Sequence, residues 1–370
     1  MTNSFHERLY GAESKNLFKP LISKIIQLAQ ETADTLKINF SEPLYKNPKS
    51  LIILWTPSYD FQASAGVSQA DENQHSITIF YGAAIEIYKD GALLPLMCTQ
   101  HLTEEKYSEL FTLLDYGNGP KQIFPPDLSI DDAKTRFFST SFTWLYLHEQ
   151  AHLFQNHGAI LDSELGEASK KNQFAWEEFS LENKEPITGK EAWIRHAFEL
   201  SADFEATSLT IQHLLIEDKQ NLKKTTLWLF VAGLTCLFHR FYGNERSTHG
   251  GEAVGTHPDP AYRMRYAFTS IVSLLTHPMV KQYVPWANTS EDLYKVMTHA
   301  FNTANLYMQI AHFKEPGFPE FMSRTVDDSE DRKKYLAKTT STWNSLRPKV
   351  MQTYFGWGDA CVMNFTKAEH

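Results

Sequence analysis

The chain has few cysteines and no long hydrophobic run. Its three cysteines, Cys98, Cys236 and Cys361, are far apart and form no CxxC or Cys/His pair. This spacing argues against a disulfide-rich secreted fold and against a thiolate zinc site. The most apolar stretch, residues 227–238, has twelve residues, whereas a membrane span needs about 20. We therefore expect a core helix there and no membrane span.

Positive charge is also scarce. Lys and Arg number 35 against 44 Asp and Glu, a formal net charge of −9 at pH 7, so we expect no attraction to nucleic acid or anionic lipid from net charge. Glu7 and Arg8 lie where a signal peptide would need an apolar run, which favours a cytoplasmic location. No internal repeat or low-complexity tract is visible, which argues against a solenoid.

The remaining composition is that of a globular protein. Hydrophobic residues make up 42% and charged residues 21% of the 370, so the chain can bury a large core. Apolar residues at helical spacing predict an amphipathic helix over residues 14–34. β-branched and aromatic residues predict strands at 51–56 and 76–88, followed by a turn at Asp90 and Gly91.

A change of character along the chain predicts two regions. Glycine and proline are concentrated in residues 116–127, and proline blocks helix formation while glycine loosens the chain. We therefore expect a domain boundary in this segment. The predicted fold class is α+β: a smaller α+β N-terminal region over residues 1–125 and a mainly helical domain over residues 126–370.

The second region has the periodicity of helices. They are expected at 131–157, 191–216, 225–241, 262–275, 291–312 and 327–346. Ser129, with Asp132 three residues later, predicts an N-cap for the first of these helices. Gly158 predicts its C-cap, because glycine readily adopts the left-handed conformation that often follows a helix.

The first of these helices contains HEQAH, residues 148–152. Residues four apart lie on one face of a helix, so His148 and His152 can bind one cation, and zinc is the ion that this pair favours. Glu149 would lie beside the ion, where a carboxylate can take a proton from metal-activated water and return it to the leaving amine. The alternative is a chance pair of histidines on an ordinary helix.

The second helix carries Glu199 and Asp203, again four residues apart. A catalytic zinc takes three protein ligands and one open position, so Glu199 is expected to be the third ligand. Asp203 is expected to accept the other ring N–H of a ligating histidine. Glu205 competes for the ligand role but has no acid four residues later. The alternative for the whole helix is a solvated acidic face.

A loop with several glycines and prolines precedes the helix at 262–275 and carries possible donors. His257 and Arg263 lie on either side of the junction between loop and helix, where both could stabilise an oxyanion on a substrate carbonyl. Tyr262 is a third candidate donor, and His249 is a weaker rival of His257. The alternative is a structural turn in which Asp259 caps the helix.

The order HExxH, ExxxD and THPxxxxR resembles the gluzincin zinc peptidases, which include HtpX-type and CAAX prenyl proteases. The segment THPDPAYRMRY is most similar to the phage-exclusion Lit peptidases. The likeness extends over roughly residues 138–270 and rests on three short motifs that are specific only in combination. The resemblance implies zinc ligation by His148, His152 and Glu199, general-base catalysis by Glu149, and contacts to the oxyanion or substrate from His257 and Arg263.

The family resemblance implies a zincin-like fold and a zinc metalloendopeptidase that cleaves a protein or peptide substrate, with a role in phage defence. The chain departs from these families in two respects. Tyr262 directly precedes Arg263, whereas the Lit form has its tyrosine two residues before the arginine, so no role is transferred to Tyr262. The multi-span membrane anchors of the HtpX and CAAX groups are not apparent either, which argues against lipidated or membrane substrates.

Two other classes of function stay open. The chain could be a sensor or interaction protein with a structural zinc on a peptidase scaffold, which a fourth protein ligand would indicate. It could also be a latent enzyme that acts only when an unknown partner opens the site, with the N-terminal region serving for recognition or inhibition.

Overall fold

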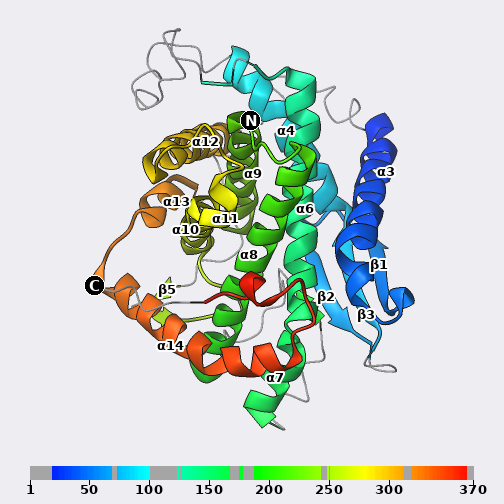
Figure 1. Ribbon diagram of the computed structural model, residues 1–370, viewed down its shortest axis with the longest axis vertical. Helices are drawn as coiled ribbons and strands as arrows, with labels where there is room; N and C mark the ends of the chain where they lie inside the picture. Colours follow the sequence, from blue (N-terminus) through cyan, green and yellow to red (C-terminus); the bar gives the residue numbers. More distant parts are fainter. Residues whose placement is uncertain are drawn as a thin grey trace, which may run out of the picture.

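A computed structural model of the chain describes most of its residues: 19–68, 73–100, 123–125, 127–166, 175–177, 187–242, 248–249, 251–311 and 318–364. They form a mainly helical protein with a small mixed sheet on one side (Figure 1), which agrees with the α+β class. Across these described ranges, none of the helices combines the length and the apolar character that a bilayer crossing requires.

The N-terminal part consists of a helix, a sheet and a second helix. Its elements are α3 (Lys19–Leu36), β1 (Leu51–Thr56), β2 (Ala63–Val67), β3 (His75–Phe80) and α4 (Tyr81–Gln100). The strand order is β1-β3-β2-β4, where β4 (Ala175–Glu177) comes from later in the chain. β1 runs parallel to β3, and β2 runs antiparallel to both β3 and β4. The expected strand at 51–56 is confirmed, and the expected first helix is confirmed from residue 19 onward.

The predicted strand at 76–88 is wrong in part, and the predicted turn at Asp90 and Gly91 is wrong entirely. The strand ends at Phe80, and the residues that follow, Asp90 and Gly91 included, belong to helix α4. Contacts from distant parts of the chain hold this helix together: Asp90 accepts two hydrogen bonds from Arg240, at 2.7 and 2.8 Å. Gly91 lies against Phe137, which a Cβ on the glycine would approach within 3.1 Å.

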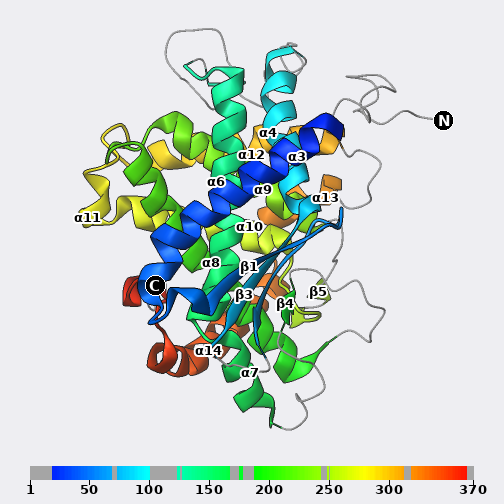
Figure 2. The same cartoon turned by 90° about the vertical axis from the view of Figure 1, so that its right-hand side faces the viewer.

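Helix α6 (Ile130–Phe154) is the central element of the fold. Ser129 caps it as predicted, because its side chain accepts a hydrogen bond from the Asp132 backbone N–H. Every residue from Thr140 to Gln155 is buried, since α6 packs against α8 (Gly189–Glu217), α4, α9 (Lys224–Tyr242), α3 and strand β2. Figure 1 shows α6 and α8 side by side, and Figure 2 shows the sheet in front of them.

The predicted C-cap at Gly158 is wrong. Helix α6 ends at Phe154, and Asn156 takes up the left-handed conformation, with φ 53° and ψ 38°. A new helix, α7 (His157–Leu165), then begins, so Gly158 lies in its first turn. Asparagine tolerates the left-handed region better than most residues with a side chain. The helix expected over 131–157 is thus confirmed up to Phe154, and a second helix begins at His157.

The C-terminal part is helical, as expected. Its helices beyond α9 are α10 (Pro260–Thr276), α11 (Pro278–Lys281), α12 (Ser290–Ala311), α13 (Phe318–Thr325) and α14 (Glu330–Thr353). A two-stranded ribbon of β5 (Thr248–His249) and β6 (Glu252–Ala253) precedes α10. Helix α14 begins after the predicted start at residue 327 and continues seven residues beyond the predicted end at 346.

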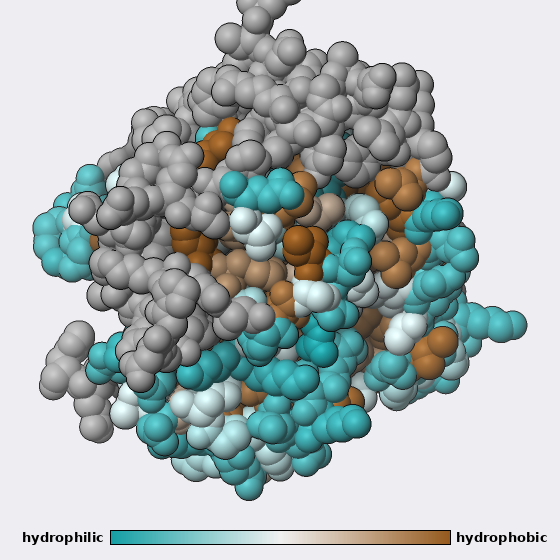
Figure 3. Space-filling model, turned by 90° about the horizontal axis from the view of Figure 1, so that it is seen from above, coloured by the Kyte–Doolittle hydropathy of each residue, from teal (hydrophilic) through white to brown (hydrophobic). Residues whose placement is uncertain are grey.

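A single large cluster of buried apolar residues joins the two parts of the chain. It includes Ile25 and Ile77 from the N-terminal part and Trp144 and Leu209 from the helical part. Most of the segment 116–127 lies outside the described residues, and the division at residue 125 stays a prediction. On the face shown in Figure 3, the described hydrophobic side chains occur in separate patches between hydrophilic ones.

Candidate metal centre

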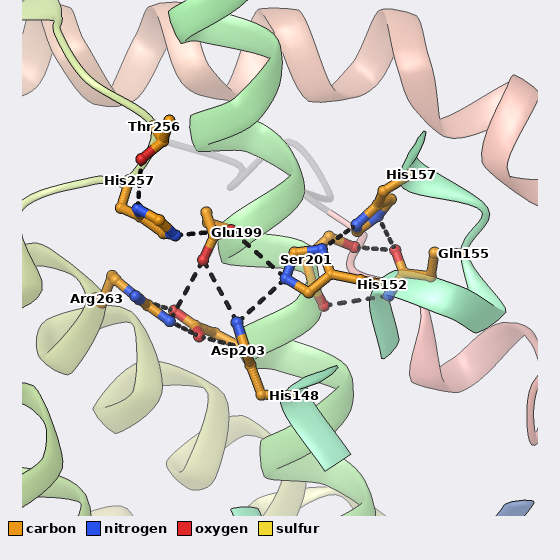
Figure 4. A network of polar contacts seen from close by, with 10 residues as sticks. All are labelled: His148, His152, Gln155, His157, Glu199, Ser201, Asp203, Thr256, His257 and Arg263. Atoms are coloured by element: carbon orange, nitrogen blue, oxygen red, sulfur yellow. Dashed lines mark hydrogen bonds and ion pairs between the residues drawn. The ribbon is translucent and has the colours of Figure 1, made fainter. Parts of the chain in front are cut away.

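Two packed helices supply the candidate ligands. His148 and His152 lie on α6, and Glu199 lies on α8, where the two helices pack against each other. Ala202, one of the small buried residues of α8, has no exposed surface, which allows a close approach between helices. The ligand atoms of the two histidines and of the glutamate all lie within 4.8 Å of one another. Figure 4 shows the three side chains directed toward a common point.

The distances between these atoms are close to those around a small tetrahedral ion. Nε2 of His148 and Nε2 of His152 are 3.1 Å apart. Oε2 of Glu199 lies 3.4 Å from the first of these nitrogens, and Oε1 lies 3.4 Å from the second. Donors that share a tetrahedral zinc at about 2.0–2.2 Å lie roughly 3.3–3.6 Å from one another. The set of two imidazoles and one carboxylate is also one that zinc favours. The residues present could therefore hold a metal ion, and zinc is compatible with this set of ligands.

Asp203 lies beside His148, in the position from which it could orient the ring. Its Oδ1 lies 3.1 Å from Nδ1 of His148, so the proton of that ring is placed on Nδ1 and the lone pair on Nε2, toward Glu199 and His152. Burial alone would raise the pKa of the Asp203 carboxyl, but the Arg263 guanidinium and the hydrogen bonds from His148 and Arg263 hold it below its ordinary value. Asp203 therefore stays ionised inside the protein.

Arg263 forms a buried ion pair with Asp203. Its Nε and Nη2 donate to the two carboxylate oxygens at 2.9 and 2.8 Å, and Nη2 also lies 3.5 Å from Oε2 of Glu199. The guanidinium lies over the rings of Phe238 and Phe241, and the side chain is 1% exposed. The structure thus places Arg263 beside the candidate ligand Glu199 and in an ion pair with Asp203, and its predicted contact with an oxyanion or substrate stays a prediction.

His257 also lies beside the ligand group. Its Nε2 is 3.5 Å from Oε1 of Glu199, and its Nδ1 is 2.6 Å from the hydroxyl of Thr256. The loop is anchored to the start of α8 by a hydrogen bond from the Gly255 N–H to the Ile187 carbonyl. Gly255 has φ of 85°, a conformation that glycine adopts without strain. The loop and α8 therefore meet at the candidate ligands.

Asp259 has the capping role that the structural alternative assigns to it. Its side chain accepts a hydrogen bond from the Ala261 N–H at 2.8 Å, at the first turn of α10. Burial raises the pKa of this carboxyl, although the Arg324 guanidinium, with which it forms an ion pair, opposes the shift. The loop is thus a capped turn and also carries a side chain to the ligand group, so the two interpretations are compatible.

The other sequence candidates lie elsewhere. Glu205 accepts hydrogen bonds from Gln155 and Tyr354 and is not in the group of converging ligand atoms. Tyr262 packs in a separate apolar cluster with Tyr335, and the Arg332 guanidinium lies 4.3 Å from the centre of its ring. His249 is in strand β5, and its side chain lies outside the described part of the structure.

Glu149 is buried with the ligands. It follows His148 on α6, and 1% of its surface is exposed. The three candidate ligands are equally enclosed, with exposed fractions of 0% for His148, 3% for His152 and 0% for Glu199. A substrate can reach these groups only if part of the surrounding chain moves.

His157 was not among the predicted site residues. Its Nδ1 lies 2.9 Å from Nδ1 of His152, and its ring stacks on Phe198 with 4.1 Å between the centroids. Burial, with the neighbouring His148, lowers the pKa of His157 well below its ordinary value, and burial likewise lowers that of His152. Both rings are therefore neutral. The sequence signal was a third histidine five residues after the second, at a place where a continuous helix was expected.

Glu205 is a buried acid close to this histidine pair. It has no exposed surface, and burial raises its pKa to about 7.

Comparison of the chain with known proteins found no relative. No protein-family model, no curated protein and no solved structure matches it.

Proposed function

We propose that the chain is a zinc-dependent metalloendopeptidase. The observation that carries the proposal is the convergence of two imidazole Nε2 atoms and one carboxylate from two packed helices, with an HExxH glutamate on the same helix as the histidines. Among the residues that the structure describes, three side chains converge as candidate ligands, and a zinc held by three protein ligands would keep one position for water or substrate, as catalytic zinc sites do. The enclosed helix pair beside a small mixed sheet supports a zincin-like fold.

The chemistry divides between the metal and the chain. When bound, zinc supplies a Lewis acid that makes water nucleophilic near neutral pH. Glu149 accepts a proton from the attacking water at its carboxylate and donates it to the amine nitrogen as the C–N bond breaks. Asp203 holds His148 in its metal-binding tautomer, and Arg263 holds Asp203 and Glu199 in place.

His257 is the group best placed to contact the substrate. Its Nε2 lies on the Glu199 side of the ligand group, from which an imidazole N–H can donate to the oxyanion that develops on the scissile carbonyl. A protein substrate, a cytoplasmic location and a role in phage defence follow from the family resemblance and from sequence signals, and they stay predictions.

Burial of the ligands favours a second candidate, a zinc-binding sensor or interaction protein without catalysis. The candidate ligands are at most 3% exposed, so a substrate has no open path to an ion that they would hold. A latent peptidase whose site is opened by a partner fits the same burial. These candidates differ from an active enzyme in turnover and not in metal content, so both quantities must be measured.

The experiment combines elemental analysis with a cleavage assay. We expect close to one zinc per chain in the parent protein, and clear loss in Glu199→Ala but not in Glu191→Ala, a control on the first turn of the same helix. Glu149→Gln should keep its zinc and lose hydrolysis of an unfolded protein substrate, detected as new N-termini by mass spectrometry.

Three outcomes decide between the candidates. A folded parent without zinc refutes the metal site. Zinc without turnover in the parent favours the non-catalytic or latent candidates. Turnover that persists in a zinc-loaded Glu149→Gln variant refutes the mechanism.

A further inference from the structure

The two candidate histidine ligands are supported differently. His148 faces the carboxylate of Asp203, at 3.1 Å, which is a frequent arrangement for a metal-binding histidine. His152 instead faces another imidazole, that of His157, at 2.9 Å between the two Nδ1 atoms. Two neutral imidazoles can form this hydrogen bond only if one Nδ1 carries a proton and the other a lone pair. Which ring donates is decided by the partners of His157.

Gln155 sets the direction of that hydrogen bond. Its Nε2 donates to Oε2 of Glu205 at 2.7 Å and to the Ser201 carbonyl at 3.3 Å. Its Oε1 therefore faces the other way, where it accepts from the Ser201 hydroxyl at 2.6 Å and lies 3.0 Å from Nε2 of His157. An amide oxygen only accepts, so Nε2 of His157 carries the proton and Nδ1 carries the lone pair.

The same logic assigns the tautomer of His152. Since Nδ1 of His157 accepts, Nδ1 of His152 must be the donor. The lone pair of His152 is then on Nε2, which lies 3.1 Å from Nε2 of His148 and 3.4 Å from Glu199. The chain of bonds thus leaves a lone pair on the nitrogen that faces the other two ligands.

This series of hydrogen bonds extends to the segment after α14. Glu205, which fixes the Gln155 amide, also accepts a hydrogen bond from the Tyr354 hydroxyl at 2.9 Å. The next residue, Phe355, donates its backbone N–H to the carbonyl of Phe154 at 3.3 Å, at the end of α6. Side chains from α6, α7 and α8 and from residue 354 therefore form one connected polar path, part of which Figure 4 shows.

From these contacts we infer that His157 is a positioning residue that locks His152 in its metal-binding tautomer, with Gln155, Glu205 and Tyr354 fixing its own orientation. The inference rests on the metal site of the proposed function. It adds a neutral hydrogen-bond acceptor that supports His152, whereas Asp203 supports His148 as an anion. Without His157, the His152 ring loses the acceptor that holds its proton on Nδ1, and the opposite tautomer or a rotated ring becomes accessible.

The test compares metal binding in His157→Phe and His157→Asn. Phenylalanine keeps the stacking on Phe198 but removes the acceptor, whereas the asparagine carbonyl can replace Nδ1 as acceptor. We expect His157→Phe to bind zinc about 10–100-fold more weakly in competition with a chromophoric chelator. The absorption spectrum of its cobalt-substituted form should also change. His157→Asn should recover part of the affinity and the parent spectrum.

A second buried histidine provides the control. His299 is 3% exposed and accepts a hydrogen bond from Trp228, so His299→Phe tests the general effect of replacing a buried imidazole. It should leave zinc affinity and the cobalt spectrum unchanged. Circular dichroism of every variant before metal addition establishes that the chain is folded.

The outcomes separate this inference from the proposed function. Parent-like zinc affinity and cobalt spectrum in a folded His157→Phe variant overturn the role of His157 and leave the metal site intact. If His157→Phe does not fold, the two single variants His157→Asn and Gln155→Leu replace it. A zinc affinity of Gln155→Leu equal to that of the parent then overturns the inference. A folded parent that binds neither zinc nor cobalt overturns the metal site and this inference together, whatever the peptidase assay shows.

Discussion

The Asp203 carboxylate lies 3.1 Å from Nδ1 of His148, the ring nitrogen that faces away from the other candidate ligands. The same carboxylate binds Arg263 through two hydrogen bonds. One buried anion therefore orients a candidate metal ligand and neutralises a buried cation, so its removal should affect metal affinity and folding together.

Asp203→Asn is expected to weaken zinc binding by about 10–100-fold, because a neutral amide supports the imidazole less well than a carboxylate. It should also destabilise the metal-free protein by about 3–5 kcal/mol, because it leaves Arg263 buried without its anionic partner. Chelator competition measures the first effect, and denaturant unfolding in the presence of a chelator measures the second.

The control is a double-mutant cycle with Arg263→Met. The double variant should lose much less stability than the sum of the two single variants, because it leaves no unpaired charge inside the protein. Additive losses would contradict the ion pair as the source of the destabilisation.

Zinc removal is expected to lower the stability of the parent protein. A ligand that binds only the folded chain at 100 times its Kd adds about 2.7 kcal/mol to the free energy of unfolding. We therefore expect the Tm to rise with added zinc in the parent and to change little in Glu199→Ala. An equal rise in both proteins would mean that zinc binds somewhere other than the His148, His152 and Glu199 group.

His257→Phe is expected to lower kcat by at least ~10²-fold while zinc content is unchanged, because it removes a donor to the oxyanion but no ligand. The measurement is single-turnover cleavage with elemental analysis of the same sample. His277→Phe, which replaces an exposed histidine that caps α11, is the control and should keep the parent rate. A normal rate in His257→Phe would leave the loop with only its capping role.

Glu205→Gln is expected to raise stability more at pH 8 than at pH 5. Burial raises the pKa of Glu205 from 4.5 to about 7. Between these two pH values the folded chain therefore keeps a proton on Glu205 that the unfolded chain has released. Stability therefore falls as pH rises from about 4.5 to 7, by about 3 kcal/mol for a shift of this size, as an order of magnitude. Glutamine has no such titration.

The measurement is the free energy of unfolding of the metal-free parent and Glu205→Gln at both pH values. The amide oxygen can still accept a hydrogen bond from Gln155, and the amide N–H can donate to the Tyr354 oxygen, so both partners are kept although the direction of the second bond is reversed. A stability difference that is the same at pH 5 and pH 8 would show that the carboxyl does not retain its proton in the folded state.

The central part of the site could be predicted from local spacing. Positions four apart on a helix share a face whatever the rest of the fold, so HExxH and the Glu199 and Asp203 pair each predicted a common direction for their side chains. That the two faces meet required one further inference, that a zinc site needs a third ligand. Asp203 lies 3.1 Å from Nδ1 of His148, and its support of a metal-binding histidine stays a prediction.

The errors have non-local causes. Residues 76–88 are rich in β-branched and aromatic residues, which suits a strand, but α4 is stabilised by packing on α6 and by the contact of Asp90 with Arg240, 150 residues away in the sequence. The contact of His157 with His152 occurs across the break between α6 and α7, where Asn156 adopts the left-handed conformation. We expected a glycine, Gly158, to adopt that conformation, but Asn156, one residue before His157, adopts it instead.

A left-handed residue lies between α6 and α7, so the position of the His157 ring relative to His152 depends on the number of residues between them as well as on the packing of the helices. An insertion or deletion between these residues would turn the His157 ring away from its partner. Homologous chains that use the same support should therefore keep the spacing H-E-x-x-H-x-x-Q-N-H, with E-x-x-x-D-x-E on the second helix. The combined pattern offers a way to recognise distant relatives by the residues that hold the ligands, where the ligands alone are too few to identify them.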